Sequence, residues 1–144
     1  MTHFDTRYVD DIFIIYNGTI RQIESFKNYI NKLNKKIQFT SEIESDNSIN
    51  FLDIKIKKNN DKLKFSVYRK PTTTDTVIHN DLHHPKNQKL AAFNSLIHKA
   101  LSIPMDIEDF NNEINIIKQI AKNNGYNIRL INQVIENMKT KIII

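Results

Sequence analysis

Two adjacent carboxylates, Asp10 and Asp11, interrupt an apolar run, "RYVDDIFIIY", at residues 7–16. A buried carboxylate without a partner is so costly that it normally neutralises, pairs with a cation or binds a metal. The flanking segments, 7–9 and 12–16, are typical of β-strands, which places both acids at a hairpin tip. Neighbouring side chains on a strand point to opposite faces, so adjacent acids converge only at a turn. The pattern indicates a Mg²⁺ site, because Mg²⁺ prefers one or two carboxylates with water and phosphate oxygens. The alternative is a solvated turn, where Asp is common.

The composition is that of a small globular protein with a basic bias. The 144 residues suit one modest domain or two small subdomains that share a core. The absence of cysteine excludes disulfides and thiol catalysis. A net charge of +5 and a pI of about 9.3 favour an acidic partner such as nucleic acid. The opening "MTHFDTRYVDD" lacks the apolar core of a signal peptide and the closing "KIII" is too short to span a membrane, so we expect an intracellular location.

The positive charge is unevenly distributed. Residues 1–70 contain 13 Lys and Arg against 9 Asp and Glu, a net charge of +4. Residues 71–144 contain 8 against 7, a net charge of +1. The N-terminal half is therefore the better electrostatic candidate for phosphate contact.

Helix and strand signals follow the acidic hairpin. Thr19 and Gln22 have the spacing of a capping box, and the stripe that follows predicts a helix ending near Lys36. Alternation over 37–43 predicts a half-buried strand. Two further alternating runs around "KNND", 58–61, predict a β-hairpin whose outer face carries lysines, which would also keep a solvated edge from aggregating. The helix stripe consists of Ile23, Phe26, Ile30 and Leu33.

The second half of the chain is predicted to be helical. Pro71 and a run of threonines end the last strand, which marks a subdomain boundary at residue 70. Pro85 opens a helix that Pro104 stops, and two more helices are expected at 107–123 and 128–139. Gly125 is the expected left-handed cap between them. The predicted fold class is α+β, with β-hairpin, helix, strand and β-hairpin followed by a three-helix bundle.

Several motifs together carry a resemblance to a known family. "RYVDDIFII" resembles the polymerase motif of reverse transcriptases, in which aspartates at a hairpin tip hold catalytic magnesium. "FLD", "YRKPT" and "HHP", in this order, are similar to the segment after the catalytic core in Penelope-like retroelements, where they lead into a thumb of helices. That region is also catalogued as a helix-turn-helix of animal retroelement proteins, and "NNGYN" matches its second turn. The resemblance extends from about Arg7 to Met138.

The resemblance implies a role for each matching residue. Residues 1–70 would be the C-terminal part of a polymerase palm, and residues 71–144 a thumb or helix-turn-helix region. Asp10 and Asp11 would be the catalytic residues that bind Mg²⁺. Cations and an aromatic side chain at the join would contact phosphates and bases. The residues implied in primer or nucleic-acid binding are Tyr8, Val9, Phe51, Leu52, Asp53, Tyr68, Arg69 and Lys70.

The implied activity is RNA-directed DNA synthesis by two-metal nucleotidyl transfer on an RNA–DNA primer-template. Such a site needs a further aspartate and the fingers, which precede this motif in the family, whereas six residues precede Arg7 here. The endonuclease that often follows the thumb is also missing. We therefore expect a fragment cut at both ends that binds Mg²⁺ weakly and does not polymerise alone. A eukaryotic retroelement protein of this kind is expected in the nucleus.

The alternative is a non-catalytic helix-turn-helix module that binds nucleic acid. Its last helix offers side chains that suit base edges in the major groove. The net charge of +1 over residues 71–144 argues against a stand-alone DNA-binding domain and favours a packed helical hairpin of the thumb. The polar residues on this helix are Arg129, Asn132, Gln133 and Lys139.

Overall fold

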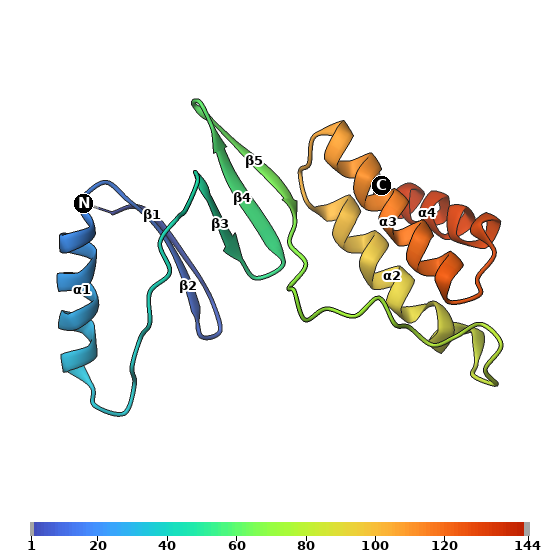
Figure 1. Cartoon of the computed structure of the whole chain (residues 1–144), viewed down its shortest axis with the longest axis horizontal. Helices are drawn as coiled ribbons and strands as arrows, with labels where there is room; N and C mark the ends of the chain where they lie inside the picture. The colour runs from blue at the N-terminus through green and yellow to red at the C-terminus, as the bar shows by residue number, and fades with distance from the viewer. Residues whose placement is uncertain (1, 143–144) are drawn as a thin grey trace.

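The computed structural model describes residues 2–142 and has an α+β architecture, which confirms the predicted fold class (Figure 1). In chain order it contains a two-stranded antiparallel sheet, a helix, a three-stranded antiparallel sheet and a bundle of three helices. The elements are β1 (Thr2–Tyr8), β2 (Asp11–Tyr16), α1 (Ile20–Leu33), β3 (Ser48–Phe51), β4 (Ile54–Asn59), β5 (Lys62–Val67), α2 (Lys86–Ser102), α3 (Ile107–Asn123) and α4 (Ile128–Ile142).

The acidic hairpin is formed by β1 and β2, joined by a turn of two residues. Tyr8 pairs with Asp11, so the turn consists of Val9 and Asp10. The prediction that both acids lie in the turn is therefore wrong for Asp11, which is the first residue of β2. A two-residue turn matches the twist of paired strands. Because Val9 occupies the first position of this turn, only one of the two acids, Asp10, lies in it.

The helix α1 begins as predicted but lies largely exposed. Thr19 Oγ1 accepts from Gln22 N at 3.3 Å and Thr19 N donates to Gln22 Oε1 at 2.8 Å, which confirms the capping box. The helix ends at Leu33, three residues before the predicted end. The strand predicted at 37–43 is absent from the described residues. Instead, Asn31 Oδ1 accepts from Phe39 N at 2.7 Å and Asn31 Nδ2 donates to Phe39 O at 3.0 Å, so a side chain takes the backbone groups that a strand ladder would use.

The three-stranded sheet has the order β3-β4-β5 and confirms the predicted hairpin between β4 and β5. The sheet also contains β3, which comes directly before this hairpin and which the alternating pattern did not predict. Leu52 has a φ of 55° and makes the turn between β3 and β4. The strand that precedes the hairpin is thus residues 48–51 rather than 37–43.

The hydrophobic core of the described residues lies in the bundle of α2, α3 and α4. The helices begin and end close to the predicted positions, with Pro85 before α2 and Gly125 between α3 and α4. The largest completely buried side chains are Phe93, Ile97, Ile117 and Ile131. Within residues 2–142, every helix is too short or too polar to cross a membrane.

Polar contacts join the three-stranded sheet to the bundle. Lys64 Nζ lies 2.5 Å from Asp106 Oδ2, at the start of α3. Lys99 Nζ on α2 lies 2.8 Å from Asp53 Oδ2, in the turn between β3 and β4. Phe65 on β5 forms a parallel bridge with Met105. These contacts hold one edge of the sheet beside the bundle.

Candidate nucleic-acid interface

The turn between α3 and α4 is fixed by the buried side chain of Asn124. Its Nδ2 donates to Ile120 O at 2.8 Å and to Asp75 O at 3.0 Å, while its Oδ1 accepts from Val77 N at 3.4 Å. One amide therefore satisfies the end of α3 and fastens the segment that enters the bundle. Beyond the motif "NNGYN", no local pattern indicates this role, because Asp75 and Val77 lie almost fifty residues earlier in the chain.

Gly125 and Tyr126 complete this turn. Gly125 has a φ of 77°, and a Cβ there would lie 2.8 Å from His79 Cε1, so both the backbone and the space favour glycine. Tyr126 is 5% exposed, and its hydroxyl donates to Ile78 O at 2.5 Å. Its ring meets Phe93 edge-on at 4.8 Å between centroids. Burial raises the pKa of the Tyr126 hydroxyl above its ordinary value.

The helix α4 has a buried face and a polar face. Asn127 Oδ1 accepts from Arg129 N at 2.9 Å, which supports the start of the helix as predicted. Ile131 and Ile135 are buried in the core. The opposite side carries the exposed residues Arg129, Asn132, Gln133, Glu136 and Asn137. Lys139, which the sequence also suggested, is partly buried and pairs with Glu136 at 2.9 Å.

The exposed side of α3 is also rich in amides. Gln119 Nε2 donates to Asn123 Oδ1 at 2.7 Å, which links two successive turns of the helix. Asn and Gln carry both a donor and an acceptor at one end, which is the pattern that adenine presents in the major groove. The exposed amides of α3 are Asn111, Asn112, Asn115, Gln119 and Asn123.

Residues 76–136 match the family model of the animal helix-turn-helix domain. The matched segment begins next to Asp75 and Val77, whose backbone groups bond the side chain of Asn124. It includes α2 and α3 and ends within α4. This match bears out the predicted resemblance to an animal helix-turn-helix domain over residues 76–136. The chain has no significant match to a curated protein or to a solved structure. The assignment of residues 1–70 to a reverse-transcriptase palm stays a prediction.

The predicted metal-binding tip is presented to solvent. Tyr8 is 61% and Val9 66% exposed, and the acids are exposed as well. Val9 has a φ of 51°, an unusual conformation for a β-branched residue, and Arg7 Nε donates to Val9 O at 2.7 Å. Within residues 2–142, Asp10 and Asp11 form no side-chain hydrogen bond or ion pair, and no group of three His, Cys, Asp or Glu could hold a metal.

The other predicted contact residues form one cluster at the sheet's junction with the bundle. Tyr68 N donates to Asp53 O at 2.8 Å, so the turn at Leu52 and Asp53 lies beside the segment of Tyr68, Arg69 and Lys70. Asp53 is the partner of Lys99, and Lys70 is exposed. Phe51 lies 5.4 Å from Phe13, between ring centroids, which links the sheet to the acidic hairpin. The structure brings these two predicted groups together, and no hydrogen bond or ion pair of residues 2–142 joins them to the acidic tip.

Arg69 is engaged by an acid that the sequence analysis overlooked. Its guanidinium forms an ion pair with Glu113 of α3, which is 6% exposed. Loss of hydration raises the pKa of Glu113, and the positive charges of Arg69 and Lys99 oppose that shift. Its helical spacing could have indicated burial. Glu113 follows Phe110 by three residues and precedes Ile117 by four, which places it on the inward-facing stripe of α3.

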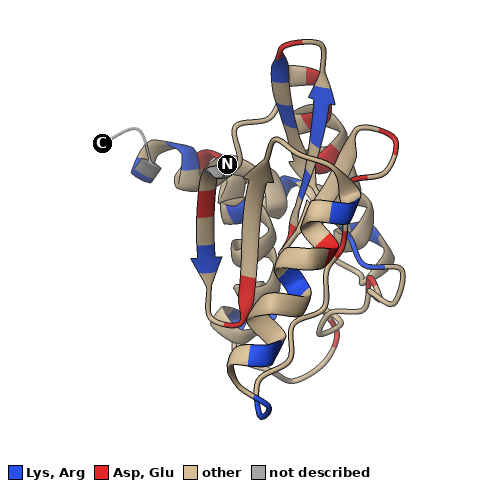
Figure 2. Ribbon diagram, turned by 90° about the vertical axis from the view of Figure 1, so that its left-hand side faces the viewer, with Lys and Arg blue, Asp and Glu red and all other residues tan. Residues whose placement is uncertain are grey.

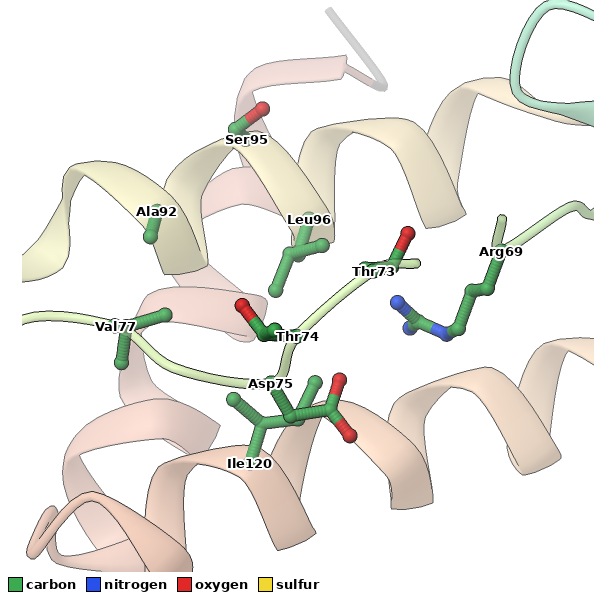
Figure 3. Close-up of a pocket in the computed structure, with 9 residues that line it drawn as sticks. All are labelled: Arg69, Thr73, Thr74, Asp75, Val77, Ala92, Ser95, Leu96 and Ile120. Atoms are coloured by element: carbon green, nitrogen blue, oxygen red, sulfur yellow. The ribbon is translucent and has the colours of Figure 1, made fainter. Parts of the chain in front are cut away.

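A cavity lies where the segment after Arg69 passes between α2 and α3 (Figure 3). Its volume is about 240 Å³, and Nε of Arg69 is buried there without a hydrogen-bond partner. Most of the lining surface is apolar, so we interpret the cavity as a packing gap between this segment and the two helices and not as a ligand site. The lining residues are Arg69, Thr73, Thr74, Asp75, Val77, Ala92, Ser95, Leu96 and Ile120.

Proposed function

We propose that the helical half of the chain is a non-catalytic DNA-binding module and that α4 contacts the bases. The observation that carries this proposal is the exposed polar face of α4, with Arg129, Asn132 and Gln133 opposite the buried Ile131 and Ile135. The family match to a helix-turn-helix domain supports the same role. A DNA partner would place the chain in the nucleus of a eukaryotic cell.

The geometry of the turn suits this task. A helix-turn-helix inserts its second helix into the major groove and contacts base edges with residues near the N-terminus of that helix. Arg129 lies in the first turn of α4, and Asn132 and Gln133 follow in the next. Arginine suits guanine and the amides suit adenine. The anchoring of Asn124 keeps α4 in a fixed orientation, which base recognition requires.

The experiment is selection of binding sites from random duplex DNA, followed by fluorescence anisotropy with the selected duplex. Arg129→Ala should weaken binding by about five-fold to a hundred-fold, the range of one lost base contact of about 1–3 kcal/mol. The control is Arg21→Ala on α1, which removes the same charge from an exposed position outside the bundle. Failure to enrich any sequence, or equal affinity of both variants, would contradict the proposal.

A second candidate concerns the acidic hairpin. We propose that residues 1–70 are the remnant of a reverse-transcriptase palm, in which Asp10 and Asp11 would hold Mg²⁺ in the presence of substrate phosphates. The supporting observation is the strained turn, because a β-branched Val9 at a φ of 51° is the kind of backbone strain that clusters at functional sites. Tyr8 and Val9 would lie beside the primer end of an RNA–DNA primer-template, with Phe51–Asp53 and Tyr68–Lys70 along it.

Two carboxylates fit Mg²⁺ only in part. Mg²⁺ is bound by one or two carboxylates together with water and phosphate oxygens, so these acids alone would give weak affinity. When bound, the ion would supply Lewis-acid stabilisation of a phosphoryl group. Within residues 2–142, the carboxylates of Asp10, in the turn, and of Asp11, at the first pair of β2, form no hydrogen bond or ion pair, so each is available to a ligand.

The test for this candidate is line broadening by Mn²⁺, a paramagnetic substitute for Mg²⁺, in amide spectra of the isotope-labelled chain. Signals from residues 8–12 should broaden first in the wild-type chain and not in Asp10→Asn/Asp11→Asn. Asp61→Asn, in the turn between β4 and β5, is the matched control. Broadening that is uniform over exposed acids would rule out a site at the hairpin tip.

A further inference from the structure

One face of the three-stranded sheet carries four lysines and no acid. Residues directly opposite in an antiparallel pair lie on the same face. Lys57 lies opposite Lys64, Lys62 opposite Asn59 and Lys55 opposite Ser66, and all four lysines are exposed. We call this surface the lysine face; it consists of Lys55, Lys57, Lys62 and Lys64. Figure 2 shows blue lysine segments along both strands of the hairpin at its top.

Apart from the exposed pair Lys58 and Leu63 near the end of the hairpin, the opposite face of the sheet is apolar and packs against the rest of the chain. Ile49, Ile56 and Phe65 share that face and are partly buried. Phe65 is bridged to Met105 on the bundle side, and Phe51 packs against Phe13. The sheet is therefore held by its apolar face, and the lysine face is left to solvent.

Two of the lysines on this face lie directly opposite each other. Lysines directly opposite each other, as Lys57 and Lys64 are, repel and destabilise the strand pair. Lys64 is paired with Asp106, whereas the other three form no ion pair within residues 2–142. A ligand with several negative charges close together would relieve this repulsion.

The helical half lacks the charge that DNA binding requires. Its net charge is +1 over residues 71–144, and phosphate contacts by Lys and Arg supply most of the affinity of a DNA-binding protein. The sheet lies beside this half, through the pairs Lys99–Asp53 and Arg69–Glu113. The missing charge is thus present on a surface fixed to the bundle.

We propose that the lysine face binds the sugar-phosphate backbone of DNA and supplies the sequence-independent part of the affinity. This inference rests on the proposed function of the helical half. Lysine suits the role because a flexible point charge follows phosphates without reading bases. Binding at this face is expected to release counterions and to weaken steeply with salt.

The test is anisotropy of the full chain on a labelled duplex of about 20 base pairs, two turns of DNA, titrated with salt from about 50 to 200 mM. The variant is Lys55→Gln/Lys57→Gln/Lys62→Gln, which retains Lys64 and its pair with Asp106. The control removes the same charge from exposed lysines after and within the end of α1, as Lys32→Gln/Lys35→Gln/Lys36→Gln. Circular dichroism checks that both variants fold.

The lysine-face variant should lower the salt slope of log K by about 2.7, or 0.9 for each lost phosphate contact, and weaken binding about ten-fold or more at low salt. The control should keep the wild-type slope. Equal slopes for the two variants would overturn the inference while leaving the function of α4 to the Arg129→Ala result. A wild-type chain that binds through the lysine face but is unaffected by Arg129→Ala would overturn the proposed function alone. Binding to phosphatidylserine vesicles without binding to DNA would overturn both.

Discussion

The two halves of the molecule use apolar residues in different ways. Every buried hydrophobic side chain among the described residues lies between Phe93 and Ile135, in or beside α2, α3 and α4. The first half has apolar patterns just as regular, yet Phe26 and Leu33 on α1 are 50% and 68% exposed. A sequence with amphipathic periodicity therefore folds into a helix in both halves of the chain. Its apolar stripe becomes part of a hydrophobic core only where other helices pack against it.

The difference also separates two kinds of candidate site. The polar face of α4 is held by a packed core and a hydrogen-bonded turn, so its side chains have fixed positions. The acidic tip of β1 and β2 is held by strand pairing, by the bond from Arg7 to Val9 and by the contact of Phe13 with Phe51. A site that needs exact geometry is better supported in the second half of the chain.

The largest test of this comparison is truncation of one aromatic residue in each half. Phe93→Ala should lower the free energy of unfolding by about 3–5 kcal/mol, because Phe93 is completely buried. Phe26→Ala, at a half-exposed position, should lower it by about 1 kcal/mol or less. Urea unfolding followed by circular dichroism measures both. Equal losses would show that α1 has a packing partner comparable to the core.

The next test addresses the turn between α3 and α4. Asn124→Ala should lower the free energy of unfolding by about 1–3 kcal/mol, since it removes the hydrogen bonds that the buried amide forms with backbone groups of Ile120, Asp75 and Val77. Asn112→Ala, on the exposed side of α3, is the control and should change stability little. A neutral Asn124→Ala would mean that water replaces the amide and that the turn is less enclosed than its burial indicates.

A smaller effect is expected at the start of α1. Thr19→Ala removes the side-chain half of the capping box and should cost about 1 kcal/mol of local helix stability. Amide hydrogen exchange should show faster exchange over the first turn of α1 and unchanged rates in the bundle. Faster exchange in α3 or α4 would reveal coupling between the two halves.

The smallest expected effect depends on pH. Burial raises the pKa of Glu113 above its ordinary value of 4.5, so the stabilisation it contributes is full below that value and is lost as pH rises through the raised pKa. Glu113→Gln cannot titrate, and its stability relative to wild type should therefore improve as pH rises from about 4 to 7. Urea midpoints across this range provide the measurement. Parallel profiles would mean that Arg69 compensates the buried charge fully.

Local signals in the sequence predicted much of the fold. The capping box at Thr19, the Asn-rich turn between β4 and β5 and the glycine cap at Gly125 each depend on neighbouring residues, and each is present in the structure. The strand expected at 37–43 is absent because Asn31 binds the backbone of Phe39, a contact that periodicity cannot express. Local patterns predicted most helices, strands and turns. Contacts between residues distant in the sequence determined which of the predicted helices and strands form.

The same division applies to the candidate sites. The exposed residues of α4 follow from helical period alone, and Arg129, Asn132 and Gln133 were named from the sequence. The buried partners Glu113 and Asn124 were missed, because their roles depend on Arg69 and Asp75, more than forty residues earlier. The roles given to Asp10, Asp11 and the other palm residues came from resemblance, and the proposed metal and binding experiments test them directly.

The turn held by Asn124 has a chemical consequence. Asn followed by Gly is prone to deamidation, in which the backbone nitrogen of the glycine attacks the side-chain amide and closes a succinimide ring. At Asn124 the amide is bound to Ile120 and Asp75, and Gly125 N donates to Lys122 O at 3.1 Å, so ring closure must wait until the turn opens. The exposed Asn17–Gly18 pair after β2 carries the same dipeptide, and neither residue forms a hydrogen bond of this kind within residues 2–142. Ageing of the purified chain should therefore modify Asn17 first, and the lag before Asn124 is modified measures how rarely the turn between α3 and α4 opens.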